Sequence, residues 1–202
     1  MIVEIYKTID LFAGIGGLRL GFERTGRCLN VFSAEIDKKA CQTYESNFGN
    51  NPYCDVTTIC ASDLPDFDIL LAGFPCQAFS SMGLRKGFEE TRGQLFFDIA
   101  RKKKKKRPSS FLLENVKGLL NHDRGNTFKT ILNILTEELD YKVSYQILNS
   151  KDFGAPQNRE RVYIVGFKNE SDFKFPAKSN IVCNVEIILE TNVDEKYWLS
   201  QR

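Results

Sequence analysis

Residues 8–18, TIDLFAGIGGL, decide the fold of this chain, because they join an apolar run to a glycine turn and then to a helix. Thr8–Ala13 predicts a strand, and Leu18–Arg24 has helical spacing before a stop at Gly26. The glycines let the backbone approach a ligand without an intervening Cβ, and the helix N-terminus then faces an anionic group. The stretch therefore predicts the first strand–helix unit of a nucleotide-binding α/β fold.

The rest of the chain alternates strands and helices. Apolar runs predict further strands at Cys28–Ile36, Phe67–Gly73, Phe111–Val116, Tyr141–Leu148 and Arg161–Phe167. Helical patterns are at Asp37–Phe48 with Asp37 as its cap, from Gln94 into the lysines, and at Thr127–Leu139. Helices between strands favour parallel pairing, but none separates the last two strands, which are therefore expected to be antiparallel. We predict a doubly wound, mainly parallel α/β sheet with an antiparallel strand at its C-terminal end and ligands at the carboxyl ends of the strands.

Length and composition fit one globular domain. The chain has 202 residues, 42% of them hydrophobic and 27% charged, which are ordinary globular values. Residues 1–168 are assigned to this domain, and the polar stretch 169–202, with a short apolar run at Val185–Leu189, to a connector. No apolar run reaches 18 residues and the N-terminus lacks a signal pattern, so we expect no membrane span and a cytoplasmic protein, nucleoid-associated in a bacterium.

Cysteines and basic residues leave two smaller questions. The six cysteines form no C-x-x-C pair and the chain has one histidine, so no metal site is expected. Arg101–Arg107 is an unbroken basic run, RKKKKKR. It is either a solvated helix end or a phosphate-contacting patch, and the sequence alone does not choose between them.

An acid lies at the spacing expected for a nucleotide cofactor. Glu35 closes the second strand, 21 residues after Gly14, where a carboxylate can accept hydrogen bonds from a ribose diol. Asp55, at the end of an expected third edge strand, is a candidate for an adenine amino group. These residues do not distinguish a nicotinamide cofactor from S-adenosylmethionine.

Three further segments carry candidate chemistry at strand ends. Cys76, in the loop GFPCQAFS after a buried strand, is either a packing cysteine or a nucleophile. Glu114 ends the strand FLLENV and is either a satisfied loop acid or a proton donor. Arg159 and Arg161 point the same way on an extended chain and are either a surface ion-pair cluster or a site for one anionic or carbonyl group.

Together these segments resemble the cytosine-5 DNA methyltransferases. DLFAGIGG is similar to the cofactor motif of that family, GFPCQAFS to its Pro-Cys motif, ENV to its cytosine-binding motif, and QNRERVYIVG to its Gln-x-Arg-x-Arg motif. The motifs occur in family order, and the resemblance extends from Thr8 through Phe167.

The resemblance implies a role for each matching residue. The cofactor S-adenosylmethionine would contact Phe12, Gly14, Gly16, Gly17, Glu35, Ile36, Asp55, Val56 and Leu95. Cys76 would be the nucleophile, and Glu114, Arg159 and Arg161 would surround the target cytosine. The thiolate would add to carbon 6 of a flipped base in double-stranded DNA, which activates carbon 5 for methylation.

The resemblance also implies a target-recognition region, which is not found in these 202 residues. Family members continue with a target-recognition region and two final motifs, so a second polypeptide is one expected partner, in a restriction-modification type of system. Three other interpretations stay open: a methyltransferase for transfer RNA, a non-catalytic subunit, and an NAD oxidoreductase. The last is disfavoured because it leaves Cys76, Glu114 and Arg161 unexplained.

Overall fold

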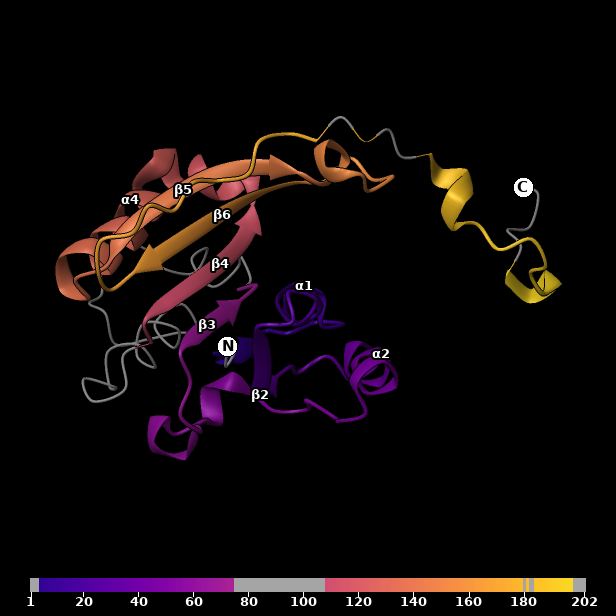
Figure 1. The fold of residues 1–202 in the computed structure, drawn as a ribbon, viewed down its shortest axis with the longest axis horizontal. Coiled ribbons are helices and arrows are strands. Elements are labelled where there is room, and N and C mark those ends of the chain that lie inside the picture. Colours follow the sequence, from indigo (N-terminus) through magenta and orange to yellow (C-terminus); the bar gives the residue numbers. More distant parts are fainter. Residues whose placement is uncertain (1–3, 75–107, 180, 182–183, 198–202) are drawn as a thin grey trace.

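A six-stranded sheet forms the centre of the fold (Figure 1). The computed structural model of the chain describes residues 4–74, 108–179, 181 and 184–197. The strands are β1 (Tyr6–Leu11), β2 (Cys28–Ala34), β3 (Ile69–Ala72), β4 (Ser110–Val116), β5 (Lys142–Asn149) and β6 (Glu160–Phe167), in the spatial order β2-β1-β3-β4-β6-β5. The first four pair in parallel, whereas β6 is antiparallel to both β4 and β5. The predicted fold class, including the antiparallel C-terminal strand, is therefore confirmed.

Helices form where the apolar spacing predicts them. These are α1 (Gly17–Glu23), α2 (Lys38–Phe48) and α4 (Asn126–Asn133), the last continuing as a π-helical turn at Ile134–Glu138. Asp37 caps α2 as expected, since its carboxylate accepts a hydrogen bond from the Ala40 N–H at 2.8 Å. In Figure 1, α1 and α2 lie beside the β2 half of the sheet, and α4 lies beside β5 and β6. Short 3₁₀ turns occupy Val56–Thr58, Ala61–Asp63, Lys117–Leu120, His122–Gly125, Ser150–Phe153, Val185–Ile188 and Glu195–Tyr197.

The strand order places a switch point between β1 and β3. From β1 the chain moves first to β2 on one side and then to β3 and β4 on the other. Leu11 pairs with Ala72, so these two parallel strands end side by side. Ile9, Leu11 and Leu113 are fully buried in the core beneath this edge. A crevice outside the carboxyl ends at such a reversal is where doubly wound proteins bind ligands.

The prediction of an edge strand that ends near Asp55 is wrong, because no strand forms in this described segment. The structure has only a parallel bridge between Glu35 and Tyr53. Pro52 contributes a carbonyl but no N–H to this pairing, and Asp55 already caps the 3₁₀ turn that begins at Val56. The extended segment is therefore too short to form a strand.

After β6 the chain returns to the β5–β6 loop. Ser179 donates to the Asp152 carbonyl through its backbone N–H at 2.8 Å and its hydroxyl at 3.1 Å, and Lys178 forms an ion pair with the Asp152 carboxylate. No helix within the described residues is long and apolar enough to cross a membrane. The predicted helix from Gln94, the basic run Arg101–Arg107, Cys76 and Leu95 lie outside the described residues.

Candidate active site

The glycine turn is built from backbone conformations that favour glycine. Gly14 and Gly16 have positive φ angles of 55° and 88°, and Phe12, just before them, has a φ of 56°. A Cβ at Gly16 would overlap the ring of Phe48, so this position has no room for a side chain. By contrast, a Cβ at Gly14 or Gly17 would meet no atom within 4 Å. The turn is therefore packed against α2 on one side and has open space on the other.

Glu35 lies against this turn and is held in one orientation. One carboxylate oxygen accepts from the Gly14 N–H at 2.7 Å, and the other accepts from the N–H groups of Ile36 and Asp37, each at 2.8 Å. Three backbone donors thus fix a carboxylate at the carboxyl end of β2, next to the turn. The hydrogen bond between Gly14 and Glu35 thus connects the two residues whose 21-residue separation predicts a nucleotide site.

The other predicted cofactor residues lie around Glu35, with different exposures. Ile36 is 59% exposed beside Glu35, and the Glu35 carbonyl accepts from Cys54, the residue before Asp55. The Asp55 carboxylate accepts from the Thr57 N–H at 2.8 Å. The side chain of Val56 is buried in the core, so any contact with a cofactor there falls to its backbone.

Asp10 was missed by the sequence analysis. It is fully buried at the end of β1, and neither carboxylate oxygen has a hydrogen bond within ordinary distance and angle limits among the described residues. Burial raises its pKa to about 7; the backbone N–H and the charge of Arg19 lower it, and Glu35 raises it further. The one sequence feature that could have pointed to Asp10 is the position of an acid inside Thr8–Ala13, which the apolar pattern predicts as a strand.

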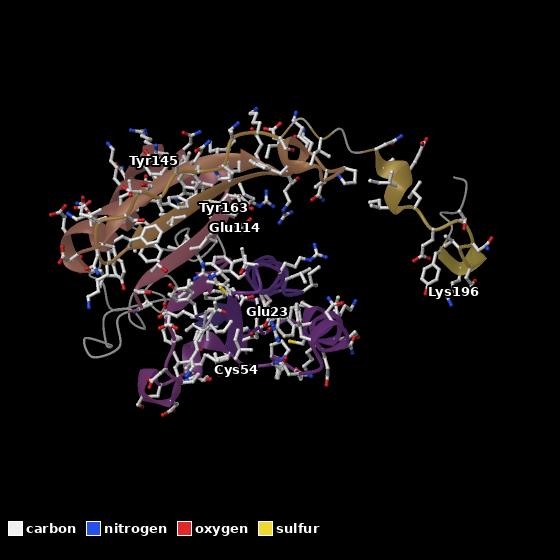
Figure 2. All side chains as sticks on the ribbon, in the orientation of Figure 1. Glu23, Cys54, Glu114, Tyr145, Tyr163 and Lys196 are labelled. Atoms are coloured by element: carbon white, nitrogen blue, oxygen red, sulfur yellow. The ribbon has the colours of Figure 1, made fainter. Side chains whose placement is uncertain are left out.

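Glu114 and Arg161 form an ion pair at the ends of β4 and β6. Arg161 Nε lies 2.8 Å from Glu114 Oε1, with side chains 18% and 21% exposed. Figure 2 shows Tyr163, which pairs with Glu114 in the strand register, beside it. Burial and the Glu114 carboxylate raise the pKa of Tyr163 above its ordinary value, whereas Arg159 and Arg161 lower it. An acid and two cations are therefore concentrated where these two strands meet.

Two asparagines position the backbone around this pair. Asn115, 2% exposed, donates from Nδ2 to the carbonyl of Phe74 at 2.9 Å, and so fixes the last described residue before the Cys76 loop. Asn149, 8% exposed, accepts from the Arg159 N–H at 3.0 Å. Sequence analysis assigned neither residue a role, although Asn115 lies within the ENV motif.

The turn and the ion pair meet at Gly73. A Cβ at this position would lie 3.5 Å from Glu114 Oε2 and 3.7 Å from the carbonyl oxygen of Phe12. One residue without a side chain therefore separates the predicted cofactor turn from the predicted catalytic carboxylate. Within the described residues, no group of three or more His, Cys, Asp or Glu side chains is arranged to hold a metal ion.

A doubly wound sheet with a glycine turn after β1, an acid after β2 and a second acid near the end of β4 matches the fold of the Rossmann-like methyltransferases. Within that class, the chain matches the family model for C-5 cytosine-specific DNA methylase over residues 6–201 and belongs to that family. The chain is 57% identical to the Type II methyltransferase M1.ScrFI of Lactococcus lactis subsp. cremoris. It is 56% identical to the Type II methyltransferase M.SsoII of Shigella sonnei.

These alignments cover nearly all of this chain but only part of the relatives. They include 98% and 96% of this chain, and 52% of each relative. Among solved structures, the Entamoeba histolytica methyltransferase EhMeth superposes with a TM-score of 0.79 at 23% identity, over 98% of this chain and 63% of that one. The Schizosaccharomyces pombe Dnmt2 methyltransferase superposes with a TM-score of 0.72 at 22% identity, over 95% and 62%. At such identities the superpositions show a shared fold alone.

Proposed function

We propose that this chain is the catalytic part of a DNA cytosine-5 methyltransferase of a restriction-modification type of system. It would transfer a methyl group from S-adenosylmethionine to carbon 5 of cytosine in double-stranded DNA. The observation that carries the proposal is the position of Gly73 between the glycine turn and Glu114, because methyl transfer requires the cofactor and the target base to lie side by side. A DNA substrate would place the protein in the cytoplasm and, in a bacterium, with the nucleoid.

The residues at the turn fit this cofactor. The free space beside Gly14 and Gly17 admits a ligand close to the backbone, and the fixed Glu35 carboxylate can accept from a ribose diol. Ile36 offers exposed apolar surface for an adenine ring. Asp55 follows Cys54, whose N–H donates to the carbonyl of Glu35. Phe12, Gly16, the Val56 backbone and Leu95 complete the proposed set. When bound, S-adenosylmethionine supplies an electrophilic methyl group.

The residues at the base site would activate the cytosine. The Cys76 thiolate would add to carbon 6, which breaks the aromaticity of the ring and makes carbon 5 nucleophilic. Glu114 would protonate or hydrogen-bond nitrogen 3, with Arg161 at oxygen 2 and Arg159 close by. After methylation, loss of the carbon 5 proton would expel the thiolate. The Phe74 carbonyl already accepts from Asn115, so a contact with the cytosine amino group would use its second lone pair.

The ion pair gives Glu114 its orientation in this scheme. Arg161 Nε forms an ion pair with one carboxylate oxygen, and Arg161 Nη1 donates to the Glu160 carbonyl at 2.8 Å. The other carboxylate oxygen of Glu114 is the one nearest to Gly73, on the side of the glycine turn. One oxygen of Glu114 is therefore held by the protein while the other faces the proposed reaction centre.

A covalent trap tests the proposal. Duplex DNA containing 5-fluorocytosine should form a stable adduct with the chain in the presence of S-adenosylmethionine, because fluorine cannot leave as a proton does. The chain spans about half the length of the relatives that it matches. The assay is therefore run with the chain alone and with the chain plus a polypeptide that carries the remaining half of such a relative. Labelled transfer RNA is the comparison substrate. Label on RNA alone would replace DNA as the substrate, and absence of any adduct with the partner supplied would refute catalysis.

A further inference from the structure

Helix α1 follows the glycine turn, and few of its own side chains stabilise its position. It has seven residues, none of them buried, and no side chain caps its N-terminus. A helix of this length is not stable by itself, because the cost of nucleation exceeds the gain from so few hydrogen bonds. Contacts from a neighbouring element must therefore fix its position, and with it the turn that it ends.

Arg19 makes those contacts. Its side chain is only 13% exposed, and its Nε donates to Glu23 of the same helix at 3.0 Å. Nη1 donates to the hydroxyl of Tyr44 in α2 and to Asn50 after that helix, both at 2.9 Å. The guanidinium also lies over the ring of Phe48, with its carbon 4.2 Å from the ring centre. One side chain thus ties α1 to α2 by a hydrogen bond and a stacked contact, and to the segment after α2 by a second hydrogen bond.

The ring beneath Arg19 also packs against the turn itself. Gly16, at the N-cap of α1, approaches Phe48 so closely that a Cβ there would overlap the ring. Tyr44 packs against Phe48 with ring centres 4.6 Å apart and shares a buried hydrogen bond with Ser33 of β2. The guanidinium, the two rings and Gly16 therefore form one packed group, and a shift of Arg19 would be transmitted to the turn.

Arg19 is also the cation that acts on the buried Asp10. The two residues flank the turn, Asp10 at its start and Arg19 just beyond its end. Two charged side chains influence the Asp10 carboxyl: Arg19, from α1, favours its ionised form, and Glu35, after β2, opposes it. Neither Asp10 oxygen has a well-formed hydrogen bond among the described residues, and the two influences that favour its ionised form are the backbone N–H of Arg19 and then the charge of Arg19.

We propose that Arg19 is a positioning residue of the cofactor site, which clamps α1 onto α2 and thereby holds the glycine turn in its binding conformation. The proposal rests on the proposed function for the identity of the cofactor, but the clamp itself is a property of the chain. Arginine is required because its planar fork donates to two acceptors while it stacks on an aromatic ring. Lysine would keep the charge beside Asp10 and lose the fork and the stacking.

Three variants of the 202-residue chain separate these contributions. Arg19→Met removes the charge, the fork and the stacking, whereas Arg19→Lys removes the fork and the stacking but keeps the charge. Arg24→Met is the matched control, because Arg24 is an exposed arginine at the C-cap of the same helix. Binding of S-adenosylmethionine is measured by calorimetry, and hydrogen exchange is followed in peptides covering residues 10–18. We expect Arg19→Met to weaken binding about tenfold or more, the equivalent of one charge-assisted hydrogen bond, and to speed exchange in the turn. Arg24→Met should stay within about twofold of the unmodified chain, as surface substitutions do.

Urea unfolding at several pH values adds a measurement that a purely packing role would not change. Since Arg19 lowers the pKa of Asp10, the pH at which stability stops falling should rise in Arg19→Met and stay unchanged in Arg19→Lys. Unchanged exchange at residues 10–18 in Arg19→Met would overturn the clamp, whatever the binding result. If the unmodified chain does not bind S-adenosylmethionine, the proposed function fails, and the exchange measurement still decides the role of Arg19.

Discussion

Replacing Asp10 by asparagine should change how the stability of the protein depends on pH. Burial raises the pKa of Asp10 in the folded state to about 7, against an ordinary value of 3.8. The folded state therefore binds this proton more tightly than the unfolded state between these two values. Stability from this group is fully present below pH 3.8, falls as the pH rises towards 7, and is constant above that.

The size of the effect follows from the same two values. A shift of about three units corresponds to about 4 kcal/mol, at about 1.4 kcal/mol per unit. Between pH 5 and pH 8 the unmodified chain should lose about 2–3 kcal/mol more than Asp10→Asn, because asparagine does not titrate. The amide of the variant has its own burial cost, about 1–3 kcal/mol, but that cost is independent of pH.

Urea unfolding followed by circular dichroism between pH 5 and pH 8 measures this difference. The comparison uses the pH dependence of the free energy of unfolding, from which the constant cost of the amide cancels. Asp172→Asn is the control, because Asp172 is exposed, and its curve should run parallel to that of the unmodified chain. Parallel curves for Asp10→Asn as well would refute the argument that burial raises the pKa of Asp10 in the folded state.

Three substitutions test the chemistry and the geometry of the site. Cys76→Ser should abolish the covalent complex with 5-fluorocytosine DNA and leave S-adenosylmethionine affinity unchanged, because a hydroxyl is a far weaker nucleophile than a thiolate; adduct formation by the serine form would contradict this. Glu114→Gln should slow methylation by about 10²-fold or more, since an amide cannot supply a proton, and a rate within about threefold of the unmodified protein would argue against general acid catalysis. Gly73→Ala should fold normally, because its Cβ would make only ordinary contacts at 3.5 and 3.7 Å, yet reduce methylation by occupying the space between the glycine turn and Glu114. Gly21→Ala, whose Cβ meets no atom within 4 Å, is its control in both melting and activity measurements, and equal activity of the two variants would disprove the role of Gly73.

Local sequence patterns predict most elements of the fold and most residues of the candidate site. Apolar runs and helical spacing are set by which side chains are buried within one strand or helix, so short segments such as FDILLAG and Thr127–Leu139 contain the information needed to predict them. The 21-residue spacing of Gly14 and Glu35 likewise follows from one strand–helix–strand unit, and the structure joins the two residues by a hydrogen bond. The prediction of an edge strand was wrong because the apolar pattern takes no account of the N–H that Pro52 lacks or of the cap that Asp55 forms.

Which of these side chains meet depends on the tertiary structure. Glu114 pairs with Arg161 because β6 returns antiparallel beside β4, and Asn115 reaches the Phe74 carbonyl because β3 and β4 are neighbours. The burial of Asp10 and its proximity to Arg19 depend on how α1 packs against the sheet. Such contacts join residues that are distant in the chain or separated by a turn. Strand order, register and helix packing fix them through the burial of the whole core, and no local pattern in the sequence specifies that.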